Sequence, residues 1–219
     1  MAVTTSHEKK IKQVSIILLI LLIPLIICFL NLRLAVFNLD FYKQEFSQYN
    51  PEVDNPLNIT QNLLNYLKNS YVAEENLISF NQEETAHLRD VKGLIQLNSL
   101  VLNILFILAI VLVALLYYIG KKEIIANIGI VLTGGGLLSL ILGGIFKIIA
   151  GNFANAFDKF HRIFFEGGWL FPANYTLIKL FPEKFFIDVV YLILTRIFIA
   201  AIIILIVGIL IILSQKRRK

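Results

Sequence analysis

The hydrophobic positions of this chain are gathered into four long runs separated by polar segments. The runs cover residues 14–36, 97–119, 124–149 and 187–213. A helix needs about 20 mostly apolar residues to cross the hydrocarbon core of a bilayer. None of the runs alternates apolar and polar residues with a period of two, as the strands of a membrane barrel do. The pattern therefore predicts an all-α integral membrane protein with four transmembrane helices.

The segment 38–96, between the first two runs, carries two signals of helix starts. Asn55 followed by Pro56 is typical of a cap and the first helical residue. Asn81 is followed three residues later by Glu84, in the arrangement of a capping box. The second signal predicts one long helix that begins just after the cap and continues into the second apolar run. The segment is therefore expected to be a structured helical loop rather than a linker.

The segment 151–186, between the last two runs, is rich in aromatic residues. Phe157, Phe160, His161 and Phe164 recur at helical spacing, which predicts a short helix. Rings of this kind are typical of an aromatic belt at the level of the lipid headgroups. The alternative interpretation is an apolar cover under which a lipid-like substrate is held.

Composition and charge support the membrane interpretation and give it a direction. Hydrophobic residues make up 58% of the chain and charged residues 16%, with a mean hydropathy of +0.77. The formal net charge of +5 is unevenly distributed. The termini and the connection between the second and third runs sum to +7, whereas the two long segments, taken with Arg33 and Asp188, sum to −4. The positive-inside rule then predicts cytoplasmic termini and two external loops within a single membrane domain, residues 1–219. No nucleic-acid partner is expected, because the basic residues reflect topology and contact with anionic lipid.

Two of the three histidines, His87 and His161, lie in different external loops on the same side of the membrane. On the expected helix, Glu84 and Asp90 lie on faces that neighbour His87. A carboxylate in that position can fix the imidazole tautomer and raise its basicity. The two histidines are therefore candidates for acid–base chemistry, although a histidine in an external loop is more often simply solvated.

Two other interpretations of the same residues remain open at this point. His87 and Asp90, three positions apart, could join His161 as zinc ligands in a metal-dependent membrane lipid hydrolase, although no HExxH motif or cysteine cluster occurs. The chain could also be a non-enzymatic membrane scaffold whose loops bind a partner. Arg196 lies about nine residues inside the fourth run, where a charge is costly and marks a functional or partnered site.

The first loop contains the pattern Glu84-x-x-His87-Leu88-x-Asp90-Val91-Lys92. This pattern resembles the E-x-x-H-M-x-D-V-K signature of the bacterial lipoprotein intramolecular transacylases, with Leu88 in place of the usual methionine. The second loop resembles the same family over Phe160-His161-x-x-Phe164-Phe165, Gly168-Trp169-Leu170-Phe171, Leu177-Ile178-x-Leu180-Phe181-Pro182 and Phe185-Phe186-x-Asp188. It departs from the family at 172–175. Two separated motifs in the expected order, on a four-span frame, cover most of the chain.

The resemblance implies an acyltransferase that moves the sn-2 acyl chain of an N-terminal S-diacylglyceryl cysteine to the α-amine of that cysteine. The product is a lyso-form lipoprotein. The nucleophile and the ester both belong to the substrate, so the resemblance implies no cofactor and no metal. The partners would be a diacylated membrane lipoprotein and membrane lipids. The expected location is the bacterial plasma membrane, as a multi-pass protein with its active site on the extracytoplasmic side.

Under the same resemblance, His87 and His161 would be the catalytic residues. One would act as base toward the ammonium and the other as acid toward the departing glycerol oxygen. His161 is favoured as the base, because apolar surroundings would keep it neutral. The supporting or substrate-binding candidates are Glu84, Asp90, Lys92, Arg162, Trp169 and Arg196. The preferred acyl length and the oligomeric state stay open.

Overall fold

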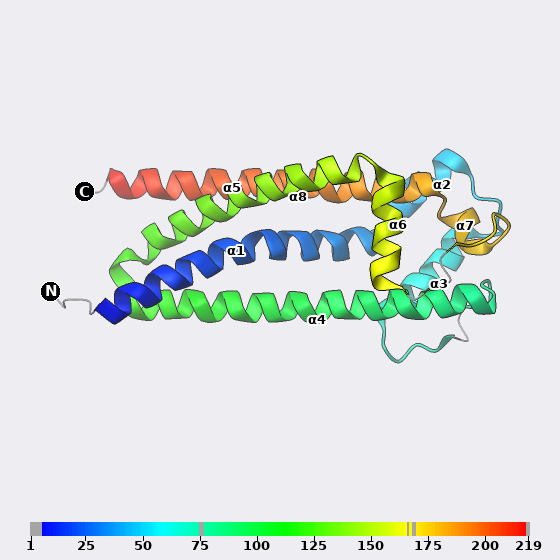
Figure 1. Cartoon of the computed structure of the whole chain (residues 1–219), viewed down its shortest axis with the longest axis horizontal. Coiled ribbons are helices and arrows are strands. Elements are labelled where there is room, and N and C mark those ends of the chain that lie inside the picture. Colours follow the sequence, from blue (N-terminus) through cyan, green and yellow to red (C-terminus); the bar gives the residue numbers. More distant parts are fainter. Residues whose placement is uncertain (1–5, 75–76, 166, 168–169, 218–219) are drawn as a thin grey trace. The chain divides into compact units, whose positions relative to one another are not determined.

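The computed structural model describes residues 6–74, 77–165, 167 and 170–217. Within these residues the regular elements are helices (Figure 1). In chain order they are α1 Ser6–Val36, α2 Leu39–Tyr49, α3 Pro56–Lys68, α4 Gln82–Ile119, the 3-10 turn η2 Lys121–Glu123, α5 Ile124–Ala150, α6 Phe153–Phe164, α7 Thr176–Leu180 and α8 Glu183–Lys216.

The four predicted apolar runs fall in four long helices. In the described part of the chain, α1, α4, α8 and the stretch from η2 through α5 are long and apolar enough to cross a membrane. The prediction of an all-α membrane protein with four spans is confirmed. α4 also confirms that a single helix begins outside the second apolar run and continues through it. The direction in which the termini face stays a prediction.

The chain divides into two compact units. The first, called here the span unit, comprises Met1–Asn31, Val101–Lys147 and Leu194–Lys219. The second, called the loop unit, comprises Leu32–Leu100 and Ile148–Ile193. Helices α1, α4, α5 and α8 each contribute residues to both units. The two predicted external loops therefore fall within the loop unit.

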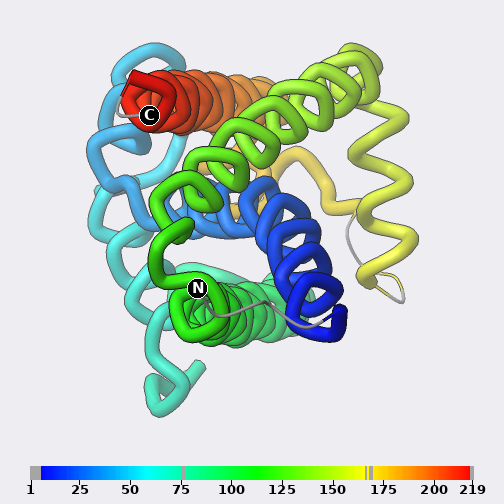
Figure 2. Tube along the Cα trace, turned by 90° about the vertical axis from the view of Figure 1, so that its left-hand side faces the viewer, coloured from blue at the N-terminus to red at the C-terminus, as the bar shows by residue number. Residues whose placement is uncertain are grey.

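In the span unit, α5 passes close to α8 (Figure 2). The closest approaches are at glycines. A Cβ atom added at Gly136 would lie 2.8 Å from the backbone nitrogen of Leu205. One added at Gly208 would lie 2.5 Å from the backbone nitrogen of Thr133. Because the atoms in the way belong to the backbone, only a residue without a side chain fits at this crossing. Small residues of this kind are common where membrane helices pack together.

A neighbouring side of α5 packs against α1. Gly134 and Gly135 lie against the side chains of Ile20 and Ile23. A buried apolar cluster joins α1, α4 and α5, and consists of Leu19, Leu22, Leu112, Leu116 and Val131. The Lys12 ammonium at the start of α1 also pairs with the Glu123 carboxylate in η2. These contacts connect α1, α4 and α5 within the span unit.

The loop unit has a separate core, which is mainly aromatic. Tyr42 and Phe46 of α2 pack against Phe181 and Phe185, with ring centroids 5.3 to 6.3 Å apart. The Tyr49 hydroxyl donates a hydrogen bond of 2.6 Å to the Leu180 carbonyl. α2 therefore packs the first segment of the loop unit against its second segment, which lies more than 100 residues later in the chain. The sequence analysis did not predict this helix.

A pair of carboxyl groups borders this core. Glu45 on α2 is only 3% exposed and lies close enough to Asp188 on α8 to feel its charge. The Asp188 carboxylate also accepts a hydrogen bond of 2.5 Å from Lys184. Burial, and then the neighbouring Asp188, raise the pKa of Glu45. Glu45 therefore takes up a proton more readily than an ordinary glutamate.

We expect Gly136→Ala to destabilise the protein, because the new methyl group meets the backbone of α8. The cost expected for such overpacking is about 1–3 kcal/mol. The matched control is Gly144→Ala on the same helix, where an added Cβ has nothing within 4 Å. Thermal unfolding in detergent should show a lower Tm for the first variant only. Equal Tm values for the two variants would contradict the proposed close packing of α5 on α8.

Candidate active site

The first turns of α4 are fixed by the capping box that the sequence predicted. The Asn81 side-chain oxygen accepts a hydrogen bond of 3.0 Å from the Glu84 N–H. In return, a Glu84 carboxylate oxygen accepts one of 2.9 Å from the Asn81 N–H. Two of the N–H groups that a helix start leaves without partners are satisfied in this way. His87 lies one turn further along, on a helix whose start is therefore well anchored.

The same carboxylate also holds the second loop in place. The other Glu84 oxygen accepts a hydrogen bond of 2.7 Å from the Leu177 N–H in α7. Two more hydrogen bonds join these segments, from the Thr176 hydroxyl to the Ser79 carbonyl and from the Tyr175 hydroxyl to Glu83. The Glu84 side chain is 1% exposed, yet both of its oxygens have donors. Glu84 is therefore a structural bridge between the starts of α4 and α7.

His161 lies near the end of α6 and is 7% exposed. Its Nδ1 atom is 2.8 Å from the carbonyl oxygen of Phe157, one turn earlier. A backbone carbonyl can only accept, so this contact assigns the proton to Nδ1. The imidazole lone pair is then on Nε2. In this tautomer the imidazole can take up a further proton at Nε2.

The structure brings His87 and His161 together within the loop unit. Their rings are nearly parallel, with centroids 6.2 Å apart. The buried ring of Phe165 lies 4.7 Å from His87 and 5.2 Å from His161, so the three rings form a triangle. The ring of Phe171 also contacts His87 edge to face, with the two ring centroids 5.4 Å apart. Both imidazoles are therefore surrounded mainly by aromatic rings.

These surroundings keep both imidazoles uncharged at neutral pH. Burial, and then the proximity of His161, lower the pKa of His87 to about 4, against a smaller opposing effect of Asp90. Burial also lowers the pKa of His161, opposed by the Phe157 carbonyl and by Asp158. In the described structure, the buried Nδ1 of His87 has no hydrogen-bond partner. A pair of neutral imidazoles offers both a proton acceptor and an N–H donor at one place.

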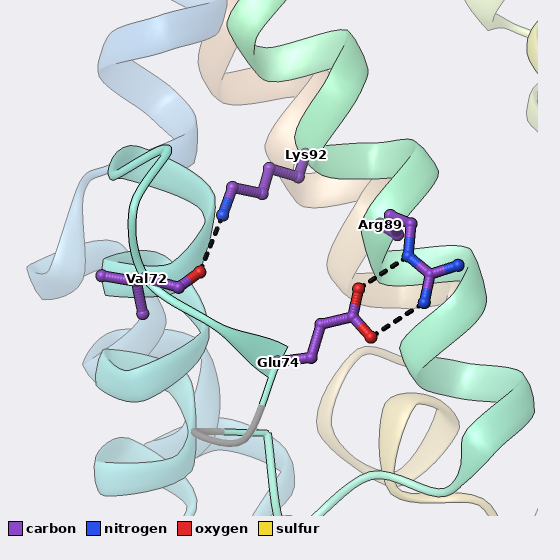
Figure 3. A network of polar contacts seen from close by, with 4 residues as sticks. All are labelled: Val72, Glu74, Arg89 and Lys92. Carbon is purple, nitrogen blue, oxygen red and sulfur yellow. Dashed lines mark hydrogen bonds and ion pairs between the residues drawn. The ribbon is translucent and has the colours of Figure 1, made fainter.

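Lys92, by contrast, points toward Val72 in the segment before α4 (Figure 3). It lies about 140° around the α4 axis from His87, at about 100° per residue. Its ammonium donates a hydrogen bond of 3.0 Å to the Val72 carbonyl and sits 4.0 Å above the Tyr66 ring. Arg89, on the same side, makes two hydrogen bonds of 2.6 and 2.8 Å to Glu74. Both cations hold the segment before α4 against the helix.

The remaining candidates lie outside the histidine pair or outside the described residues. Asp90 is exposed, although its charge is felt at His87. Arg162 is exposed and pairs with Asp158 at 2.8 Å. Arg196 is half-buried in the span unit. Trp169 lies outside the residues that the structure describes.

Three features of the site were not foreseen from the sequence. These are the Phe157 carbonyl, the Leu177 N–H and the triangle that Phe165 makes with the two imidazoles. Two of the three are backbone groups, which leave no signal in a sequence. Among the described residues, no group of three or more histidine, cysteine or acidic side chains is arranged to hold a metal ion.

The fold and site define a helical membrane protein with two neutral histidines in an aromatic environment. Residues 14–186 match the family model of the lipoprotein intramolecular transacylase Lit. Because this match covers more than half of the 219 residues, the chain belongs to the lipoprotein intramolecular transacylase family. Transacylases are acyltransferases, and the resemblance seen in the two loop motifs is thereby confirmed.

Solved structures show the same fold. The chain is similar to the membrane integral lipoprotein intramolecular transacylase Lit from Bacillus cereus, with a TM-score of 0.73 and 21% identity, covering 93% of this chain and 98% of that one. A structure of the same protein with one histidine replaced by arginine gives a TM-score of 0.69, with 20% identity over 93% of this chain and 95% of that one.

A relative in sequence is an uncharacterized protein of Aquifex aeolicus. It is 29% identical over 133 residues, which make up 60% of this chain. The matched part spans 57% of the length of that relative.

We expect Glu84→Ala to lower the stability of the loop unit, because two backbone N–H groups lose a buried acceptor. Each buried donor left without a partner costs about 1–3 kcal/mol. The control is Glu83→Ala, which removes an exposed carboxylate that accepts a hydrogen bond from the Tyr175 hydroxyl. Thermal unfolding should show the larger loss of Tm for Glu84→Ala. A loss no larger than that of the Glu83 variant would contradict the bridging role.

We also expect acid to destabilise the protein through His87. The folded-state pKa of His87 lies below the ordinary value of 6.5, so the unfolded chain takes up the proton first. The free energy of unfolding therefore falls as the pH drops from about 6.5 toward 4. Unfolding measured at pH 7 and pH 5 should show a smaller loss for His87→Asn, which does not titrate in this range. An equal loss in both proteins would contradict a depressed pKa at His87.

Proposed function

We propose that the chain transfers the sn-2 acyl chain of an N-terminal S-diacylglyceryl cysteine to the α-amine of the same cysteine. The product is an N-acyl, S-monoacylglyceryl lipoprotein. The observation that carries this proposal is the pair of neutral imidazoles, 6.2 Å apart and surrounded by aromatic rings, in a member of a transacylase family. Both reacting groups belong to the substrate, so the protein has to supply positioning, proton transfer and stabilisation of developing charge.

His161 acts as the general base in this proposal. Its Nδ1 is bonded to the Phe157 carbonyl, which leaves the lone pair on Nε2 to accept the proton of the substrate ammonium. The freed amine nitrogen attacks the carbonyl carbon of the sn-2 ester and forms a tetrahedral intermediate. When the ester C–O bond breaks, the glycerol oxygen receives a proton. Two protons leave the nitrogen overall, one from the ammonium and one when the tetrahedral intermediate becomes the amide. One of them is matched by the proton that the glycerol oxygen takes up, and the other is released to solvent.

His87 acts as the hydrogen-bond donor in this proposal. A neutral imidazole carries one N–H, which can stabilise the ester oxygen as charge develops on it or protonate the departing glycerol oxygen. The low pKa of His87, near 4, means that this donor carries no positive charge at neutral pH. The substrate ammonium is therefore not repelled as it approaches. The tautomer of His161 supports this assignment of roles.

The proposed location is the bacterial plasma membrane, with the site on the extracytoplasmic side. The charge of +7 on the termini and the short connection, against −4 on the loops, supports this direction. The proposed partners are a diacylated membrane lipoprotein and the surrounding lipids. The four apolar helices agree with a multi-pass protein whose substrate is anchored in the same bilayer.

Mass spectrometry of a diacylated lipopeptide after incubation with the purified protein tests the proposal. We expect one acyl chain to move to the α-amine, at a rate that falls about 10²-fold or more in His87→Ala and in His161→Ala, as loss of acid–base catalysis would cause. The control His7→Ala, far from both motifs in sequence, should keep the full rate.

Two outcomes would overturn the proposed function. One is an unchanged rate in either of the two histidine variants. The other is activity that a metal chelator abolishes and added zinc restores, which would favour the metal-dependent hydrolase considered above. Unfolding measurements on each variant separate a loss of catalysis from a loss of the fold.

A further inference from the structure

Helix α6 buries one histidine but leaves most of its apolar face uncovered. His161 is 7% exposed, whereas Phe160, Ile163 and Phe164 are 44%, 74% and 48% exposed. The polar side chains lie on the opposite half of the helix, with Arg162 about 200° around the axis from Phe160. Arg162 is paired there with Asp158. The uncovered apolar face is therefore a feature of a strongly amphipathic helix.

The position of α6 in the chain supports contact of this face with lipid. α6 begins at Phe153, three residues after α5 ends at Ala150, and α5 is one of the four helices long and apolar enough to span a membrane. An amphipathic helix that directly follows a span lies at the boundary between headgroups and acyl chains, with its apolar face toward the acyl chains. The exposed rings of Phe160 and Phe164 would then contact lipid.

The exposed rings are connected to the histidine pair without a break. The Phe164 and Phe160 centroids are 4.9 Å apart, and Phe160 meets His161 edge to face at 5.4 Å. Phe165 then joins His161 to His87, at 5.2 and 4.7 Å. The ring contacts therefore form a continuous series from the exposed face of α6 to both imidazoles. Ile163 has no place in this series of ring contacts.

We propose that Phe160 and Phe164 form the path along which the sn-2 acyl chain of the substrate passes from the adjoining lipid leaflet to His161. This inference rests on the proposed function, because it assigns the acyl chain as the occupant of the exposed face. The ester has to reach the imidazoles while most of its acyl chain stays in an apolar environment. The series of rings provides that environment from lipid to site. Phe160 and Phe164 are thus specificity residues, which bind the acyl chain and take no part in proton transfer.

The test is steady-state kinetics with lipopeptides that carry palmitoyl or octanoyl chains. We expect Phe160→Ala and Phe164→Ala to raise the KM for the palmitoyl substrate about tenfold with little change in kcat, because apolar contact area is lost while the imidazoles are untouched. The octanoyl substrate, whose chain extends less far along the rings, should be less affected. Phe160→Leu, which restores apolar contact, should return the KM most of the way to that of the unchanged protein.

Ile163→Ala is the matched control, since this residue shares the exposed face but not the ring contacts. If it raises KM as much as Phe160→Ala does, the face is a general lipid anchor and the acyl path is wrong. A fall in kcat with no change in KM for either phenylalanine variant would also overturn the inference, as would equal effects on both chain lengths.

The inference fails separately from the proposed function. If the histidine variants lose acyl transfer while the phenylalanine variants keep the original KM for both substrates, the reaction stands and only the acyl path is overturned. If the histidine variants keep full activity, the proposed function itself is overturned, whatever the phenylalanine variants show. Thermal unfolding of the phenylalanine variants confirms that a change in KM does not come from a misfolded protein.

Discussion

The arrangement of the loop unit depends on one buried carboxylate. Glu84 bonds to the Asn81 N–H in its own helix start and to the Leu177 N–H 93 residues away. A buried carboxylate is stable only when its oxygens accept hydrogen bonds. Separating the two segments would leave a buried carboxylate oxygen and a backbone N–H without partners, and the free energy that this costs holds the segments together. His87 follows Glu84 by one turn, and Phe171 and Tyr175 precede Leu177 along the chain. The bridge therefore fixes one wall of the histidine site with respect to the other.

Given that frame, the aromatic surroundings of the histidines decide their chemistry. An imidazole among Phe157, Phe165 and Phe171 has little to solvate a positive charge, which lowers its affinity for a proton. The absence of charge matters because the proposed substrate brings an ammonium group of its own. A neutral acceptor can approach that group and remove its proton, whereas a charged imidazolium would repel it. The apolar environment that suits an acyl chain is thus also the one that prepares the base.

The sequence was sufficient for features that depend on local pattern. The four spans, the start of α3 at Pro56, the capping box of α4 and the helix around His161 follow from apolar runs, cap residues and helical spacing. It was insufficient where distant segments meet. α2 has an almost balanced mixture of polar and apolar residues, and its apolar side is recognised only from its packing on Phe181 and Phe185. Glu84 was expected to support His87, but its bond to a backbone N–H of α7 has no counterpart in any side-chain pattern.

Lys92 shows that contacts between distant segments also limit what the sequence can predict about the site. In the sequence, Lys92 is five residues from His87 and was a candidate for supporting the site or binding the substrate. In the structure it bonds instead to Val72 and Tyr66, on the side of α4 away from the imidazoles. Arg89 is likewise held by Glu74. With these two cations directed elsewhere, the histidine pair is left without a fixed positive charge from α4. A substrate that arrives as an ammonium ion can then come within hydrogen-bond reach of a neutral base, which two nearby cations would have opposed.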